Sequence, residues 1–198
     1  YYDPNLSTLD RAGIVHRLDK NTSGLMVISR NERSQKYLVE QLQSHSVARE
    51  YSAIVYGHMI AGGIVDEPIG RDPKDRVKQA VSSSGKEATT HYRVIDRFKS
   101  HTHVKAILET GRTHQIRVHL SHIGHSLIGD SMYGGRVRFP KKASEDLKET
   151  LLNFKRQALH SKKLTLIHPI SGELMSWKSP LPDDMIKLLA ILKQFDPC

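Results

Sequence analysis

The segment at residues 50–56, with the sequence EYSAIVY, constrains the fold more than any other part of the chain. Tyr51, Ala53 and Val55 lie on one face of an extended backbone, and the alternate face is also largely apolar. A strand that is apolar on both faces is expected in the middle of a sheet. The segment runs directly into Gly57, where we expect the strand to end.

Further strands and a few helices can be predicted on either side of this segment. Strand patterns cover residues 88–98, 103–109, 158–167 and 174–177, and helical spacing covers 31–45, 114–123, 144–154 and 182–195. We expect Asn31 and Thr113 to cap the first two helices. Because short turns join strands in the middle of the chain, the predicted fold class is α+β, with a mainly antiparallel central sheet and flanking helices.

The distribution of charge points to a polyanionic partner. The 198 residues carry a net charge of +9, which is concentrated in residues 110–172, where eleven Lys and Arg oppose four acids. A basic excess confined to one region of a globular chain is typical of nucleic-acid binding. The length favours one domain with a substantial core.

The number of cysteines and the hydropathy of the chain argue against a disulfide-rich protein, a thiolate metal site and a membrane-spanning protein. The single cysteine, Cys198, is the last residue, so neither a disulfide framework nor a thiolate metal cage is expected. No apolar run approaches the length of a membrane span, and we expect a cytoplasmic protein. The first residue is not methionine, and we interpret the chain as a fragment of a longer product.

The motif HRLDKNTSG at residues 16–24 surrounds one carboxylate, Asp19, with cations and hydroxyls. An acid among cations stays ionised, as a carboxylate nucleophile must. An apolar run at residues 25–28 follows, so we expect a loop at the entrance to a buried strand. The alternative is a turn in which Asp19 caps its own backbone, and the spacing alone leaves both interpretations open.

A second motif, TGRTHQIRVHLSHIGH at residues 110–125, concentrates arginines and histidines in one turn and helix. Metal ligation is one interpretation, but helical angles scatter His114, His119, His122 and His125, and the helix lacks a glutamate for hydrolytic chemistry. A basic helix face against phosphate is another. Arg117 lies between two apolar residues, and an inward arginine needs a carboxylate partner.

Together HRLDKNTSG, REYSAIVYG and ETGRTHQIRVHLSHIGHSLIGDSMYGG resemble the RluA family of RNA pseudouridine synthases, and RQALHSKKLTLIHPISGE extends the likeness over nearly the whole chain. The resemblance implies a pseudouridine synthase fold that isomerises specific uridines in large-subunit ribosomal RNA or its precursor. It implies no cofactor and no metal. It also implies that residues 1–198 form the catalytic domain, without its amino-terminal portion and without an upstream RNA-binding module. We expect a monomer that does not bind membranes.

The resemblance also assigns roles to individual residues. Asp19 is the nucleophile, attacking either the anomeric carbon of the sugar or the uracil ring of a flipped-out nucleotide. Arg117 pairs with Asp19, and Tyr51 stacks on the base and could assist removal of the ring proton. Arg17 fills the space that the base leaves or grips its phosphate. The expected groove-lining contacts to RNA are Arg112, Arg136, Arg138, Lys141 and Lys142. We expect Thr22 and Ser23 to fix the loop.

Two other classes of function remain in competition with this interpretation. One is a catalytically silent RNA-binding module that keeps the fold and the basic surface, although the presence of Asp19, Tyr51 and Arg117 together argues against it. The other is a metal-dependent nuclease built on the histidines. An isomerisation assay with and without a chelator distinguishes all three.

Overall fold

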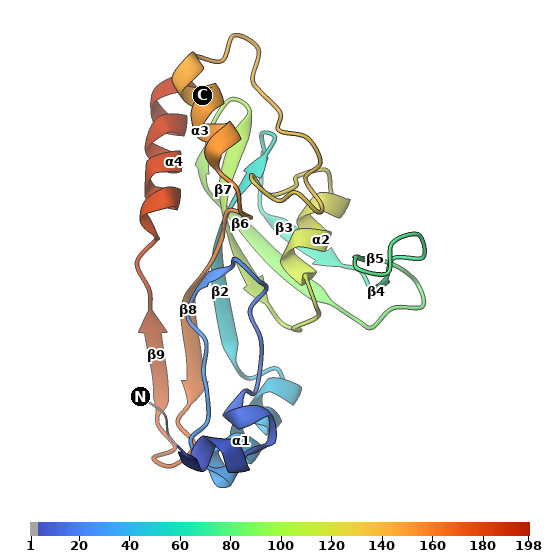
Figure 1. Ribbon diagram of the computed structural model, residues 1–198, viewed down its shortest axis with the longest axis vertical. Helices are drawn as coiled ribbons and strands as arrows, with labels where there is room; N and C mark the ends of the chain where they lie inside the picture. Colours follow the sequence, from blue (N-terminus) through green and yellow to red (C-terminus); the bar gives the residue numbers. More distant parts are fainter. Residues whose placement is uncertain (1–3) are drawn as a thin grey trace.

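In the computed structural model, which describes residues 4–198, seven strands form one long twisted sheet (Figure 1). Six of them follow the order β1-β8-β2-β7-β6-β3, and β9 pairs with β8. All pairings are antiparallel except the short one between β1 and β8. The predicted α+β class with a mainly antiparallel sheet is therefore confirmed. The strands of this sheet are β1 (Ser23–Gly24), β2 (Ala48–Tyr56), β3 (Gly63–Asp66), β6 (Thr89–Arg97), β7 (His101–Leu108), β8 (Leu159–Ile167) and β9 (Leu174–Lys178).

β2 occupies the central place that its two apolar faces predict. It pairs with β7 on one side and with β8 on the other. Tyr51 and Val55 pack in a core cluster with Leu120 of α2 (Gln115–His122). Ile54, on the opposite face, packs in a second cluster with Leu151 of α3 (Glu145–Asn153) and with residues of α4 (Asp183–Phe195). Both faces of the sheet are thus covered.

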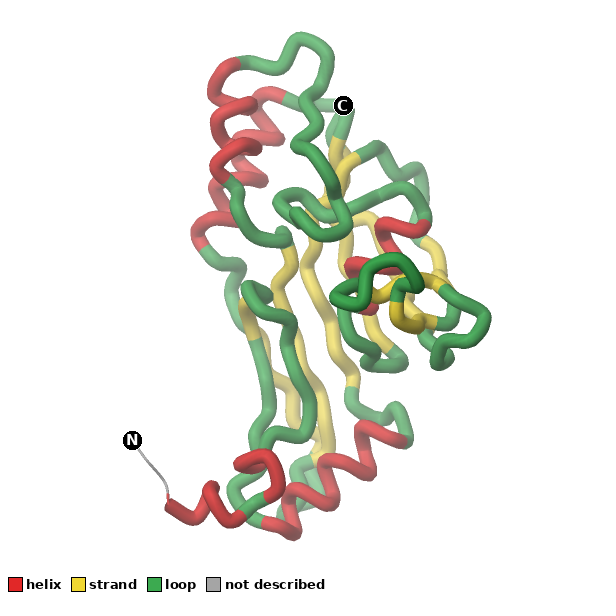
Figure 2. The backbone as a smooth tube through the Cα atoms, turned by 45° about the vertical axis from the view of Figure 1, so that its right-hand side comes forward, coloured by secondary structure: helices red, strands yellow, loops and turns green. Residues whose placement is uncertain are grey.

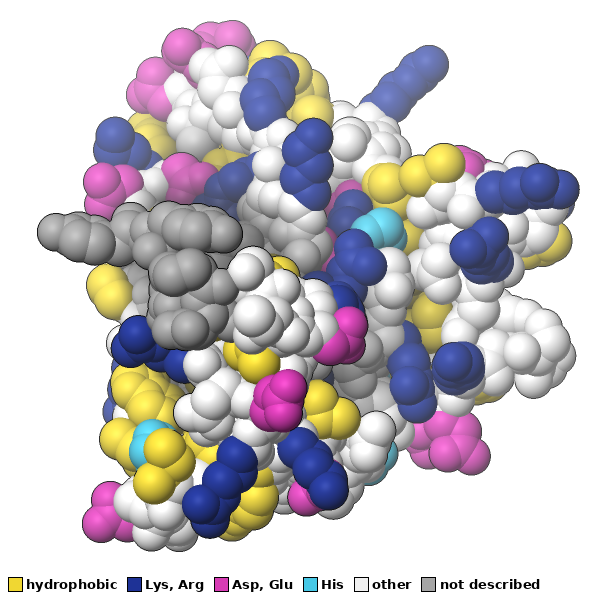
Figure 3. All heavy atoms as spheres, turned by 60° about the horizontal axis from the view of Figure 1, so that its bottom comes forward, with side chains coloured by type: hydrophobic (Ala, Val, Ile, Leu, Met, Phe, Trp, Pro, Cys, Tyr) yellow, Lys and Arg dark blue, Asp and Glu magenta, His cyan; other side chains and the backbone are white. Residues whose placement is uncertain are grey.

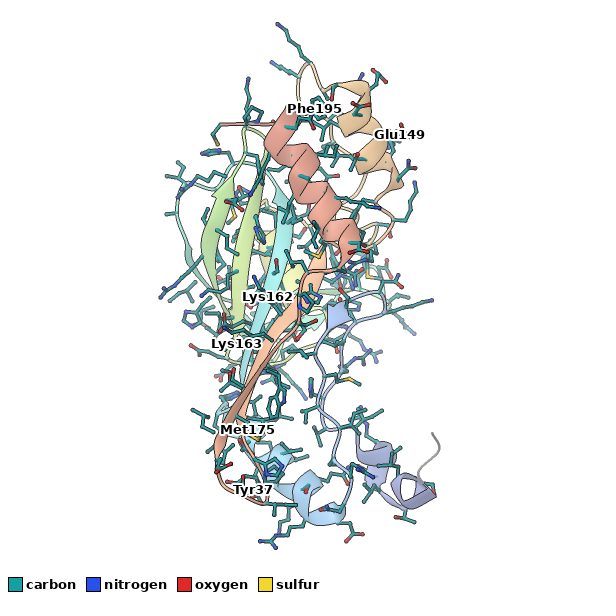
Figure 4. The ribbon with its side chains drawn as sticks, turned by 90° about the vertical axis from the view of Figure 1, so that its left-hand side faces the viewer. Tyr37, Glu149, Lys162, Lys163, Met175 and Phe195 are labelled. Carbon is teal, nitrogen blue, oxygen red and sulfur yellow. The ribbon has the colours of Figure 1, made fainter. Side chains whose placement is uncertain are left out.

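Most of the helices gather at the two ends of this elongated molecule, whereas α2 lies against the sheet between them, as Figures 1 and 2 show. α3 and α4 lie together at one end, where Figure 4 labels Glu149 and Phe195. At the other end α1 (Glu32–Gln43) follows two short 3-10 helices, η1 (Pro4–Thr8) and η2 (Asp10–Gly13). Asn31 caps α1 as predicted, because its side chain accepts a hydrogen bond from the backbone N–H of Ser34 at 2.8 Å.

Two expectations about local structure are wrong. Residues 25–28 do not form a buried strand, since only β1 pairs with β8 and Met26 and Ile28 are exposed. The reason is that β9 already occupies the same edge of β8 from Lys163 onward, which leaves the chain after β1 without a strand partner there.

Thr113 is also not the cap of α2. The helix begins at Gln115 after His114, whose φ of 58° is left-handed. The side chain of Gln115 organises this turn instead, because its Oε1 accepts hydrogen bonds from the hydroxyl of Thr110 and the backbone N–H of Arg112. The predicted position of the helix is nevertheless right, and α2 packs against the sheet beside the hairpin of β4 (Ile69–Arg71) and β5 (Gln79–Val81).

Candidate active site

Asp19 lies on a loop that hydrogen bonds hold against the start of β8. The loop turns back on itself, with the N–H of Thr22 donating to the carbonyl of Asp19 at 2.9 Å. Gln157 fixes the loop from outside, since its side-chain amide donates to the carbonyl of Lys20 at 2.7 Å and to the hydroxyl of Thr22 at 2.9 Å. The Ser23 hydroxyl bonds to His160 at 2.9 Å. Thr22 and Ser23 thus fix the loop, as expected.

The carboxylate of Asp19 contacts Arg117 of α2, 98 positions further along the chain. Nη1 of Arg117 donates to Oδ2 of Asp19 at 3.3 Å. No other hydrogen bond to the Asp19 carboxylate is present within residues 4–198, so Oδ1 remains available. The expectation that Arg117 lies beside Asp19 is met, and Asp19 does not use its carboxylate to cap its own backbone.

A second carboxylate, Asp130, holds Arg117 more tightly than Asp19 does. Nε and Nη2 of Arg117 donate to the two oxygens of Asp130 at 2.7 and 2.9 Å, and both side chains are buried. The backbone N–H groups of Met132 and Tyr133 also donate to Oδ1 of Asp130. Although burial lowers the pKa of Arg117, the hydrogen bonds and charge of Asp130, together with Asp19, raise it overall.

Sequence reasoning had not assigned Asp130 a role. It had counted this residue only as one of the four acids in the basic region. The available signal is its place in IGDSMYGG, one glycine after the apolar pair Leu127 and Ile128, because an acid that follows a buried segment needs a cation. The inward-facing Arg117 thus has two carboxylate partners rather than the single one expected.

The ring of Tyr133 covers Arg117, with the guanidinium carbon 4.9 Å from the ring centroid. The Tyr133 hydroxyl bonds to Nδ1 of His114 at 2.8 Å and accepts from the N–H of Gln79. His119 bonds to the Thr90 hydroxyl and His125 to a backbone carbonyl. Within residues 4–198 no group of three His, Cys, Asp or Glu side chains is placed to hold a metal ion.

Asp19 and Tyr51 line one pocket of about 290 Å³, close to the lower end of the roughly 300–1,000 Å³ of small-molecule sites. Tyr51 is buried, on the face of β2 that α2 covers. Burial raises the pKa of the Tyr51 phenol, so this group is protonated at neutral pH. Ile116 and Leu159 supply apolar walls. The pocket therefore combines a carboxylate, an aromatic ring and apolar walls.

The predicted RNA contacts fall into two groups. Arg17 and Arg112 line the pocket with Asp19, and Nε of Arg112 also donates to the carbonyl of Glu87. Four others do not line it: Arg136, Arg138, Lys141 and Lys142. Arg136 and Arg138 border a separate hollow, and the guanidinium of Arg138 lies 4.5 Å from the centroid of the Tyr56 ring. Figure 3 shows Lys and Arg side chains spread over one end of the molecule.

The chain was compared with known proteins and structures. Residues 1–122 match the sequence profile of a family described as RNA pseudouridylate synthase. The chain is 54% identical over 194 residues to ribosomal large subunit pseudouridine synthase D of Pseudomonas aeruginosa, and 53% identical over 193 residues to that of Escherichia coli. These matches cover 98% of this chain but 61% and 59% of the relatives, so the chain spans about 60% of their length.

Two solved human structures are similar to this one. RNA pseudouridylate synthase domain containing 4 has a TM-score of 0.72 and 28% identity, over 91% of this chain and 75% of that chain. RNA pseudouridylate synthase domain containing 1 has a TM-score of 0.68 over 93% of this chain and 81% of that chain. At 23% identity, the second likeness concerns the fold alone. Separately, no helix within residues 4–198 has the length and apolar character of a membrane span.

Proposed function

The chain belongs to the RNA pseudouridylate synthase family, and from this premise we propose that it isomerises specific uridines of large-subunit ribosomal RNA, or its precursor, to pseudouridine. The observation that carries the proposal is the contact between Asp19 and Arg117 at the wall of a pocket that Tyr51 also lines. The names of the relatives, which are more than 50% identical to this chain, support this choice of substrate. We likewise propose that residues 1–198 form a catalytic domain.

The reaction replaces the N1–C1′ glycosidic bond of uridine with a C5–C1′ bond. The proton on C5 leaves to solvent and N1 gains a proton, so the step needs neither an oxidant nor a reductant. Asp19 supplies the nucleophile through Oδ1, since Oδ2 is held by Arg117. This oxygen attacks either the anomeric carbon or the uracil ring, and both routes need the same positioned carboxylate. The proposal includes no metal and no cofactor.

Arg117 and Tyr51 act on either side of the nucleophile. Arg117 orients the Asp19 carboxylate, and its own plane is fixed by the two hydrogen bonds to Asp130. Tyr51 stacks on the uracil ring. Because burial raises the pKa of its phenol, Tyr51 is better suited to hold the ring than to take the C5 proton.

The target nucleotide must leave its RNA helix or loop to reach Asp19, which costs a few kcal/mol. The exposed Arg17 stands at the pocket beside Asp19, where it can occupy the space that the base vacates or bind its phosphate. Arg112 lines the same pocket. The other predicted contacts, Arg136, Arg138, Lys141 and Lys142, belong to a longer path of RNA across the basic region.

The test is release of tritium from ribosomal RNA labelled at C5 of uridine. We expect the protein to release tritium in the presence of a chelator, and Asp19→Asn to abolish release with RNA affinity changed only a few-fold. Asp146→Asn, at an exposed position of α3, is the matched control and should keep full activity. Residual release by Asp19→Asn above about 1% would remove Asp19 from the nucleophile role. RNA binding by the unaltered protein without any tritium release would contradict the proposed function itself.

A further inference from the structure

The pocket contains a buried arginine that the proposed mechanism does not use. Arg49 of β2 lines the pocket, two positions before Tyr51, and is only 6% exposed. Nη2 donates to the carbonyl of Glu109 at 3.0 Å, and the buried Nε has no hydrogen-bond partner within the described chain. Among residues 4–198, no carboxylate forms an ion pair with Arg49. A buried cation without a counter-ion is costly unless a ligand supplies one.

The surroundings of Arg49 do not compensate its charge. Burial lowers its pKa, opposed only by the nearby Tyr51. The neighbouring His16 is uncharged at neutral pH, because burial and then the charge of Arg49 lower the His16 pKa to about 4. Nη1 of Arg49 lies against Gly111, where an added Cβ would approach it to 2.5 Å. The absence of a side chain at Gly111 therefore gives the guanidinium its place beside the pocket.

The pocket as a whole has too few negative groups for its cations. Arg11, Arg17 and Arg112 line it together with Arg49. Asp19 is the single carboxylate among the lining residues of the described chain, and Arg117 already pairs with it. A ligand that carries negative charge would compensate these cations, above all the buried Arg49.

We propose that Arg49 binds the phosphate group of the uridine nucleotide that enters the pocket, an inference that rests on the proposed function. A phosphodiester carries a full negative charge before any reaction, and its oxygens match the forked donors of arginine. The uracil oxygens carry only partial charge in the bound substrate, so they compensate a buried cation less well. Pairing with Arg49 stabilises the extruded nucleotide and offsets part of the energy of base flipping.

The experiment is a double-mutant cycle between Arg49 and the RNA. A short RNA with the target uridine is prepared in native form and with each flanking phosphate replaced in turn by an uncharged methylphosphonate. Arg49→Met removes the charge while filling much of the same volume. On native RNA we expect this variant to raise Kd by about 10- to 100-fold. We expect one methylphosphonate to weaken binding by the unaltered protein to the same extent and to have no further effect on Arg49→Met.

Two further variants separate this role from a structural one. Arg49→Lys keeps the charge and should recover part of the affinity for native RNA. Arg93→Met, at an exposed position of β6, is the matched control and should leave Kd unchanged. A thermal melt of each protein checks the fold, and the dependence on a single phosphate is a readout that mere loss of packing does not produce.

Several outcomes would overturn the proposal. Independent, multiplying losses from Arg49→Met and from every methylphosphonate would exclude a contact with phosphate. Coupling to 2-thiouridine or 4-thiouridine instead would assign Arg49 to the base. Because the cycle reads Kd, it is separate from catalysis: if the unaltered protein released no tritium from native RNA, the proposed function would fail while the contact with phosphate could still be measured.

Discussion

Arg117 holds its two carboxylates unequally, and the inequality suits a reactive group. Two short, buried hydrogen bonds to Asp130 fix the plane of the guanidinium. The third donor, Nη1, meets Asp19 at 3.3 Å through one carboxylate oxygen only. Strong pairing of both oxygens would stabilise the carboxylate before the reaction and so oppose attack. Asp130 thus fixes the position of Arg117, and one oxygen of Asp19 stays unpaired, as the proposed nucleophilic role requires.

Asp130→Asn tests whether Asp130 fixes Arg117 in the position that orients Asp19. The amide keeps the shape of the side chain but offers one acceptor oxygen instead of two and removes the charge. We expect kcat to fall by at least about tenfold with little change in KM for RNA, because Arg117 no longer has a fixed plane. We also expect a loss of folding stability of about 3 kcal/mol, since one partner of a buried ion pair is neutralised.

Single-turnover tritium release and urea unfolding measure the two effects of Asp130→Asn. Asp146→Asn on the exposed surface of α3 controls for the change in net charge. Full activity of Asp130→Asn, at protein concentrations where it is folded, would show that Asp19 does not depend on the position of Arg117.

At the scale of residues, a contact can be predicted from the sequence where a buried charged side chain needs a partner of opposite charge. An arginine between apolar helix residues demands a carboxylate, and the structure confirms this demand, although it was the family resemblance that named Asp19 as the partner. The same argument could not identify Asp130, because no spacing rule selects among acids that are distant in sequence. The pairing depends on the turn after Ile128, in which two backbone N–H groups orient the Asp130 carboxylate.

The loop that carries Asp19 owes its position to the start of β8. Gln157 precedes the strand and donates to Lys20 and Thr22, while β1 pairs with β8 immediately after the loop. These contacts join Asp19 to the sheet that also carries Tyr51. The distance between the two groups is therefore set by the packing of β8 against β2.

Gln157→Glu replaces the donating amide with an acceptor of the same shape. The carboxylate cannot donate to the carbonyl of Lys20, so we expect the loop to loosen and kcat to fall about tenfold or more. RNA affinity should change little, because the arginines proposed to contact RNA are not altered. Gln43→Glu, exposed at the end of α1, is the control for added charge. An unchanged kcat would mean that the contacts of Gln157 do not position Asp19.

At the scale of elements, a strand or helix could be predicted where its own residues determine it, through hydrophobic alternation or a capping side chain. β2 is central because both of its faces are apolar, and α1 begins at a residue that can cap it. Residues 25–28 were predicted wrongly because strand formation there depends on whether the edge of β8 is free. That edge belongs to β9, which lies about 150 residues later in the chain. A local pattern carries no information about this competition.

On the scale of the whole molecule, one face of the sheet only packs into the core, whereas the other face also carries the candidate site. α3 and α4 bury one face in an apolar cluster. α2 covers the other face and brings Arg117 to the pocket, so the same helix closes the core and orders the site. The excess charge in residues 110–172 indicates a polyanionic partner, but composition could not distinguish Arg112 at the pocket from Arg138 on the ring of Tyr56.

Buried, uncharged histidines make the stability of the whole molecule sensitive to acid. Burial is the main cause that lowers the pKa of His16, His101, His103, His119 and His160. In each case the unfolded chain takes up a proton near pH 6.5, whereas the folded protein takes it up only at lower pH. The unfolded state therefore binds more protons as the pH falls below about 6.5, and folding stability must decrease.

His16 allows the size of this effect to be predicted, because its pKa falls to about 4. Between pH 7 and pH 5 its contribution to stability should decrease by about 2 kcal/mol, and the loss should be complete about one pH unit below its folded-state pKa. His16→Gln removes the titrating group while its amide oxygen can still accept the hydrogen bond from the N–H of Val27. In urea unfolding at both pH values, we expect the unaltered protein to lose about 2 kcal/mol more than this variant. His122→Gln, at an exposed position of α2, is the control for the loss of one histidine. Equal losses for the His16 variant and the unaltered protein would show that His16 is protonated at the same pH in the folded and unfolded states.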